Sequence, residues 1–122
     1  MTVGAKLQLK AGHAVAILGA PAGVEIDLPA GAHRTPSPDQ ADAVIVFVRT
    51  ADELARRGGA AIGAARADRL AWIAYPKAGQ LETDLNRDRL ASLVSRRGLR
   101  PVRQVAIDAV WSALRFRPAD PD

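Results

Sequence analysis

The sequence predicts one α/β domain, in which a mixed sheet of about five strands forms three layers with its helices and ends in an antiparallel C-terminal hairpin. Buried apolar runs alternate with amphipathic segments along the 122 residues. The best-defined unit is a strand over 43–48, a helix that begins after Thr50 and a strand over 70–75. Strands joined in this way are parallel with a right-handed crossover, so this unit forms the centre of the predicted sheet.

The first predicted strand is the apolar run over 14–18, which turn residues flank on both sides. The stretch over 19–38 contains three glycines and four prolines, which argues against a long crossover helix. Only residues 24–28 alternate within it. We expect a short strand there, either in a hairpin with the first strand or at the edge of the sheet.

The central strand Ala43–Val48 is β-branched and apolar on both faces, as buried parallel strands are. After it, Thr50 and Glu53 match the capping box. In that motif the Thr50 hydroxyl accepts from the amide of Glu53, and the Glu53 carboxylate accepts from the amide of Thr50. The helix should run to about residue 66, although Gly58 and Gly59 weaken its middle.

After the strand Leu70–Tyr75, a second helix is expected from residue 85 or 87 to 97, where Gly98 provides the left-handed stop. Two alternating segments come next, over 100–107 and 110–117, and predict the hairpin. We therefore expect a single domain over 1–117 and a flexible C-terminal tail over 118–122.

Composition excludes several function classes. The chain has no cysteine, so it has no disulfide, thiol nucleophile or cysteine-based metal site. Its charge of +4 is spread among acids without a nucleic-acid-binding motif, and we expect no nucleic-acid partner. No apolar run approaches the ~20 residues of a membrane span, which predicts a cytoplasmic protein with no membrane contact. His13 and His33 lack the spacing of metal ligands, so no metal is expected.

Several segments resemble the Rossmann-like core of S-adenosylmethionine-dependent methyltransferases. Residues 9–18 resemble the Leu-Lys-x-Gly entry into the first strand of those enzymes. Residues 41–45 and 69–75 are similar to their fourth and fifth strands, and the closing hairpin to their last two. The similarity covers most of the chain, by pattern rather than by diagnostic residues. It implies a Rossmann-like, methyltransferase-like fold.

Two short segments make the resemblance more specific. Pro76-Lys77 ends a strand, and Trp111–Arg115 reads Trp-Ser-Ala-Leu-Arg. Both resemble a small uncharacterised bacterial family, labelled a domain of unknown function, with a truncated core of this kind. That resemblance implies a fold but no activity.

The methyltransferases hold their cofactor with an acid and a Gly-x-Gly turn after the first strand. Here residues 18–23 contain no acid, the glycines are spaced more widely, and Pro21 lacks an N–H. Asp39 and Asp42 lie about 20 residues on but precede a strand rather than end one. We therefore expect no cofactor, with S-adenosylmethionine as the alternative.

Polar residues come directly after the predicted parallel strands at their carboxyl ends, where open α/β sheets gather ligands. A helix N-terminus beside a lysine and an arginine suits a small anion or carboxylate. The candidate anion-binding residues are Lys77, Arg49, Thr50, Gly19, Asp84, Asn86 and Arg87. The alternative is a polar rim that merely ends the strands, with Lys77 paired to Glu82 or Asp84.

Two hypotheses of function remain. No phosphate loop and no Gly-x-Ser-x-Gly elbow is present, so no catalytic residue is identified. The first hypothesis is a small non-enzymatic binding or assembly module with a degenerate methyltransferase-like core. The second is a methyltransferase or another protein that binds an S-adenosyl ligand. A homodimer is also expected, because residues 19–38 cannot supply the helix that would cover one face of the sheet.

Overall fold

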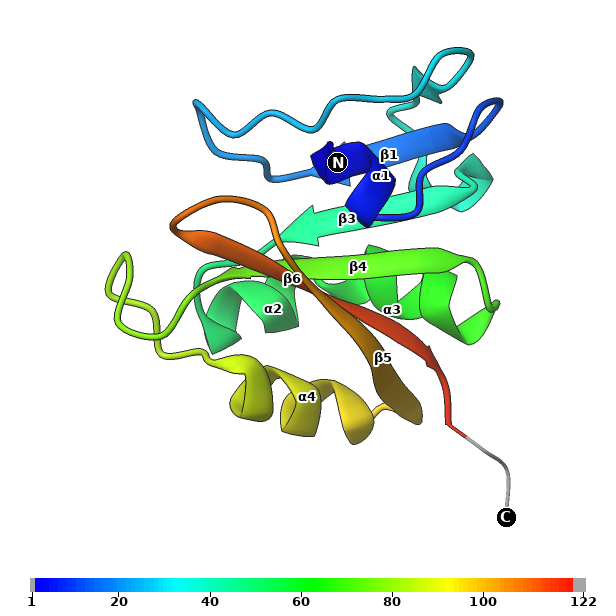
Figure 1. The fold of residues 1–122 in the computed structure, drawn as a ribbon. Helices are drawn as coiled ribbons and strands as arrows, with labels where there is room; N and C mark the ends of the chain where they lie inside the picture. Colours follow the sequence, from blue (N-terminus) through cyan, green and yellow to red (C-terminus); the bar gives the residue numbers. More distant parts are fainter. Residues whose placement is uncertain (1, 120–122) are drawn as a thin grey trace.

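The computed structural model describes residues 2–119. Its centre is one mixed sheet of six strands in the order β2-β1-β3-β4-β6-β5 (Figure 1). The first four strands in the chain are parallel, and the last two form an antiparallel hairpin that joins the sheet through β6 and β4. The strands are β1 (Ala14–Leu18), β2 (His33–Arg34), β3 (Ala43–Phe47), β4 (Leu70–Pro76), β5 (Leu99–Ala106) and β6 (Trp111–Pro118).

The helices are short. They are α1 (Val3–Lys6), the 3₁₀ turn η1 (Pro38–Gln40), α2 (Ala51–Arg57), α3 (Gly59–Arg66) and α4 (Arg87–Ser95). The α/β class, the parallel centre and the C-terminal hairpin are therefore confirmed. The helix α1 was not predicted, because a four-residue helix is too short to show a hydrophobic period.

The expected number of about five strands is wrong, and so is the strand over 24–28. The described sheet has six strands, and its edge beside β1 is β2, which pairs Ala14 with His33 and Val15 with Arg34. Residues 24–28 form no strand. Their alternation has another cause, since Val24, Ile26 and Leu28 are partly buried against the face of the sheet.

The two faces of the sheet are covered differently. One face packs against α2, α3 and α4, whose buried residues include Leu54, Ile62 and Leu90 (Figure 1). The other is covered by α1, the residues just after it and the segment 24–28. At its centre, the indole Nε1 of the fully buried Trp72 donates to the carbonyl of Leu7 at 3.0 Å.

The segment 24–28 lies directly against α1. Gly4 is buried there, and a side chain at this position would collide with the carbonyl of Asp27. Two backbone segments can approach this closely only where one of them has no Cβ atom. The face expected to be uncovered is thus covered by the chain itself, which removes the reason for expecting a homodimer; the homodimer itself stays a prediction.

The single helix predicted to follow Thr50 is two helices in the structure. The segment over 50–66 breaks at Gly58, whose backbone turns between α2 and α3. Gly58 is packed so closely that a Cβ atom there would lie 2.5 Å from the carbonyl oxygen of Leu54. Apart from proline, glycine is the residue with the lowest helix propensity, and here its small size also permits the close turn.

The C-terminal boundary lies slightly later than expected. Pro118 belongs to β6, and the amide of Ala119 donates to the carbonyl of Gly98 at 3.0 Å. The remainder of the expected tail, residues 120–122, lies outside the described residues. Among residues 2–119, none of the helices has the length and apolar character needed to cross a membrane.

Candidate functional site

The structure brings Arg49, Thr50 and Asp84 together at the start of α2. The Thr50 hydroxyl accepts from the amide of Glu53 at 3.1 Å, as the capping box predicts. The Glu53 carboxylate accepts from the amide of Arg49 at 2.9 Å, rather than from that of Thr50. Asp84 reaches across from the loop after β4 and accepts from the amide of Ala51 at 2.9 Å. The chain's own oxygens thus satisfy the amides at this helix end, and an anion there would have to displace Asp84.

The loop that carries Asp84 is tied to the end of β3 by two further bonds. The Thr83 hydroxyl donates to the carbonyl of Arg49 at 2.5 Å, and Nη1 of Arg49 donates to the carbonyl of Leu81 at 3.3 Å. Leu81 and Glu82 have φ values of 51° and 53°, a left-handed conformation that costs free energy in residues with a side chain. The loop therefore holds a strained shape through its contacts with Arg49.

Lys77 lies with the C-terminal hairpin instead of with Arg49. Its Nζ donates to the carbonyl of Asp108 at 2.8 Å, and its amide donates to the carbonyl of Val110 at 2.7 Å. Within residues 2–119, Lys77 forms no ion pair with Glu82 or Asp84. The geometry favours a structural role for Lys77, which fastens β4 to the turn between β5 and β6. Anion binding at this edge stays a prediction.

The remaining candidates have local contacts of their own. Asn86 accepts from the amide of Arg89 at 2.8 Å and so caps α4. Arg87 is exposed and contacts its neighbour Asp88 at 3.3 Å. Gly19, with a φ of 74°, lies under the guanidinium of Arg57 from α2. None of these contacts joins Asn86, Arg87 and Gly19 to one another.

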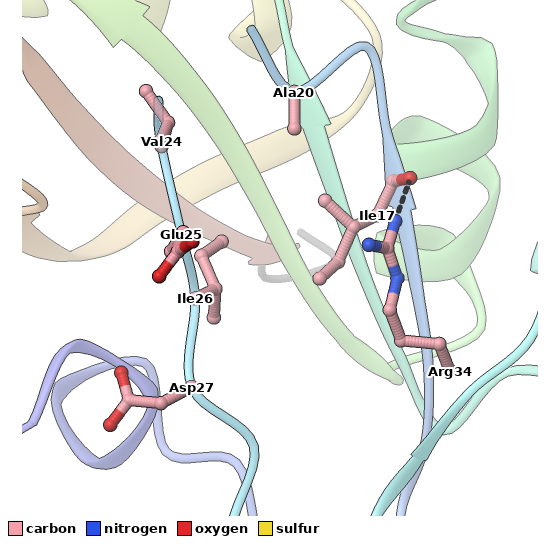
Figure 2. A pocket seen from close by; sticks show the side chains of 7 residues that line it. All are labelled: Ile17, Ala20, Val24, Glu25, Ile26, Asp27 and Arg34. Atoms are coloured by element: carbon pink, nitrogen blue, oxygen red, sulfur yellow. Dashed lines mark hydrogen bonds between the residues drawn. The ribbon is translucent and has the colours of Figure 1, made fainter. Parts of the chain in front are cut away.

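A cavity of about 490 Å³ lies instead between β1 and the segment that covers it (Figure 2). Such a volume is in the range of small-molecule sites, which measure roughly 300–1,000 Å³. The residues that line it are Ile17, Ala20, Val24, Glu25, Ile26, Asp27 and Arg34. The sequence prediction missed this cavity, because it assigned the alternation over 24–28 to a strand. The same alternation over 24–28 is the sequence pattern that could have indicated the cavity.

The cavity combines apolar walls with charged groups. Ile17 from β1 and Ile26 from the covering segment point toward one another across it (Figure 2). Arg34, the last residue of β2, donates through Nη2 to the carbonyl of Ile17 at 3.2 Å, because no backbone amide of the short β2 reaches that carbonyl. Glu25 adds an exposed carboxylate, whereas the carboxylate of Asp27 points away from Ile17 and Arg34 (Figure 2). The arrangement suits a ligand with an apolar body and groups that donate hydrogen bonds.

The structure also tests whether S-adenosylmethionine fits. The connection from β1 to β2 contains no helix whose N-terminus could face a ligand. β2 ends at Arg34, and the next residue is Thr35, so no acid ends this strand. Asp42 lies at the opposite end of the sheet, where its carboxylate accepts from the amide of Ala14 at 2.8 Å. The residues around the turn after β1 therefore do not fit this cofactor in its usual position.

Residues 2–119 contain no group of three or more His, Cys, Asp or Glu side chains placed to hold a metal ion. Comparison of the sequence with protein-family models and with curated proteins gives no significant match.

Proposed function

We propose that this chain is a small non-enzymatic binding or assembly module with a Rossmann-like core of the truncated methyltransferase type. The ligand of this module occupies the cavity between β1 and residues 24–27. The observation that carries the proposal is the connection from β1 to β2. It crosses the face of the sheet without a helix and borders the cavity, where a dinucleotide-binding fold has a glycine-rich turn and a helix N-terminus.

The chemistry of the cavity indicates the kind of ligand. Ile17 and Ile26 offer apolar surface, while Glu25 offers an exposed acceptor. The Arg34 guanidinium is held by the carbonyl of Ile17 and leaves further N–H groups at the same cavity. A neutral or cationic small molecule with an apolar body and hydroxyl or amino groups suits this combination.

Ligand screening by NMR on protein labelled at the isoleucine methyl groups tests the proposal. We expect the hits to shift the Ile17 and Ile26 methyl signals, and we expect Glu25→Gln to weaken hits that carry amino groups. Glu82→Gln is the matched control, because Glu82 is an exposed acid outside the cavity. Hits that leave both methyl signals unchanged contradict the proposed site.

Calorimetry with S-adenosylmethionine and S-adenosylhomocysteine distinguishes this proposal from the alternative of a methyltransferase. We expect no saturable heat with either compound. Submillimolar binding that Glu25→Gln or Asp27→Asn weakens would overturn the proposal in favour of an S-adenosyl-ligand protein with an unusual loop.

A further inference from the structure

A second cavity, of about 200 Å³, lies at the opposite end of the parallel strands from Arg49 and Lys77. Leu70 is the first residue of β4, and His13 directly precedes β1. The residues that line the cavity are Gln8, Lys10, His13, Leu70 and Arg115. It shares no residue with the cavity between β1 and residues 24–27, so a ligand site here is independent of the proposed function.

Arg115 is a partly buried cation that forms no ion pair within residues 2–119. Its Nη1 donates to the side-chain carbonyl of Gln8 at 2.8 Å, and its buried Nε has no hydrogen-bond partner within residues 2–119. Burial, and after it the charge of Arg117, lowers the pKa of Arg115 below its ordinary value. A guanidinium that has lost water and gained only a neutral amide is poorly compensated.

The negative charge of Asp68 acts on Arg115, but the Asp68 carboxylate forms its hydrogen bonds with another arginine. Asp68 accepts two hydrogen bonds from Arg117, at 2.9 and 3.0 Å, and is thereby committed to that arginine. In the neighbouring strand β5, Arg103 is the register partner of Arg115. The surroundings of Arg115 therefore keep an excess of positive charge.

The other polar groups at the cavity are donors. Nδ1 of His13 accepts from the amide of Lys10 at 3.2 Å, which assigns the proton of the neutral ring to Nε2. Lys10 adds an ammonium group, and Gln8 retains its amide NH₂ because its carbonyl is bound to Arg115. None of the described residues that line this cavity is acidic.

We propose that this cavity binds the phosphate group of a small molecule, with Arg115, Lys10 and His13 as its donors. A phosphate dianion supplies the ion pair that Arg115 lacks, and its tetrahedral oxygens can accept from several donors at once. The volume of about 200 Å³ holds such a group, and it is below the roughly 300 Å³ at which sites for whole drug-sized molecules begin.

Calorimetric titration with inorganic phosphate and with ribose 5-phosphate, each at low ionic strength, tests this site. Ribose is the uncharged counterpart and should not bind. Removing one charge-assisted hydrogen bond should weaken phosphate binding about tenfold or more in Lys10→Gln, and further in Arg115→Gln. His13→Asn keeps an acceptor for the amide of Lys10 while it removes the Nε2 donor, and it should weaken binding to the same extent as Lys10→Gln.

Arg56→Gln is the matched control, because it removes one positive charge from an exposed helix position outside the cavity. It should leave phosphate affinity unchanged. Because Arg115→Gln can also disturb folding, Lys10→Gln and His13→Asn decide the outcome. Equal affinity in these two variants and the wild type would overturn the site, as would binding of a single-stranded DNA oligonucleotide without binding of inorganic phosphate.

Discussion

At the scale of single residues, several side chains that look functional in the sequence serve the fold. Asp84 and Asn86 are candidates for ligand binding by their position in the sequence, and the structure uses them as acceptors at the starts of α2 and α4. Free backbone amides at a helix start attract a carboxylate from the same chain as readily as one from a ligand. Sequence spacing alone does not distinguish the two uses.

The pair of Asp68 and Arg117 gives a pH-dependent contribution to stability. The hydrogen bond from Arg117 is the largest cause that lowers the pKa of Asp68 below its ordinary value of 3.8. A carboxyl group whose pKa is lower in the folded state stabilises the fold above the unfolded-state pKa, and this contribution is lost as pH falls through the folded-state pKa.

We expect Asp68→Asn to lower the free energy of unfolding near neutral pH and to have a smaller effect at about pH 2.5, below the unfolded-state pKa. Asparagine is the appropriate substitution, because Asp68 has a φ of 58° and asparagine tolerates that conformation. Urea unfolding of both proteins at the two pH values measures the difference. Arg117→Gln should reproduce the loss near neutral pH, and an effect of the same size in acid would refute the assignment.

At the scale of elements, the longer strands of the sheet were predictable, whereas the two-residue β2 and the segment that covers one face were not. Ala43–Val48 and Leu70–Tyr75 could be identified because buried parallel strands are apolar on both faces. Apolar and polar residues alternate over 24–28 as in a strand. The apolar side chains pack onto the face of the sheet, but the backbone does not pair with a strand. A periodic pattern shows which side chains are buried but does not show what the backbone pairs with.

The contact of α1 with the covering segment can be tested at Gly4. We expect Gly4→Ala to cost about 1–3 kcal/mol of stability, because the added methyl group collides with the carbonyl of Asp27. Gly63→Ala is the control. Gly63 lies in α3 with open space around its Cβ position, and alanine there should stabilise the helix by about 0.5–1 kcal/mol. Urea unfolding measures both; equal effects of the two substitutions would contradict the close contact.

At the scale of the whole molecule, the cavities were harder to predict than the fold. The prediction placed ligands beyond the carboxyl ends of the parallel strands, by the rule for open α/β sheets. In this chain Asp84, Lys77 and Arg57 are engaged at that edge in contacts within the chain. The cavities depend on residues far apart in the sequence, such as Gln8 and Arg115, which no local pattern joins.

The expected homodimer remains to be tested by light scattering over a range of protein concentrations. Two features bear on the route by which it could form. One edge of the sheet is the two-residue β2, and the other is β5, which contains Pro101 and Arg103. Short strands, proline and positive charge all hinder pairing between sheet edges. A dimer mass would confirm the prediction, and a monomer mass at the highest concentration would show it to be wrong.

The segment 24–28, which covers β1, has a consequence for how the molecule opens. Within residues 2–119, the amides of residues 25–28 donate no hydrogen bonds, whereas the strands beneath them belong to a continuous ladder. Regions with few backbone hydrogen bonds and partly buried side chains open at a lower free energy than the core. The cover can therefore lift while the sheet stays intact, so a ligand can enter the cavity beneath it without global unfolding.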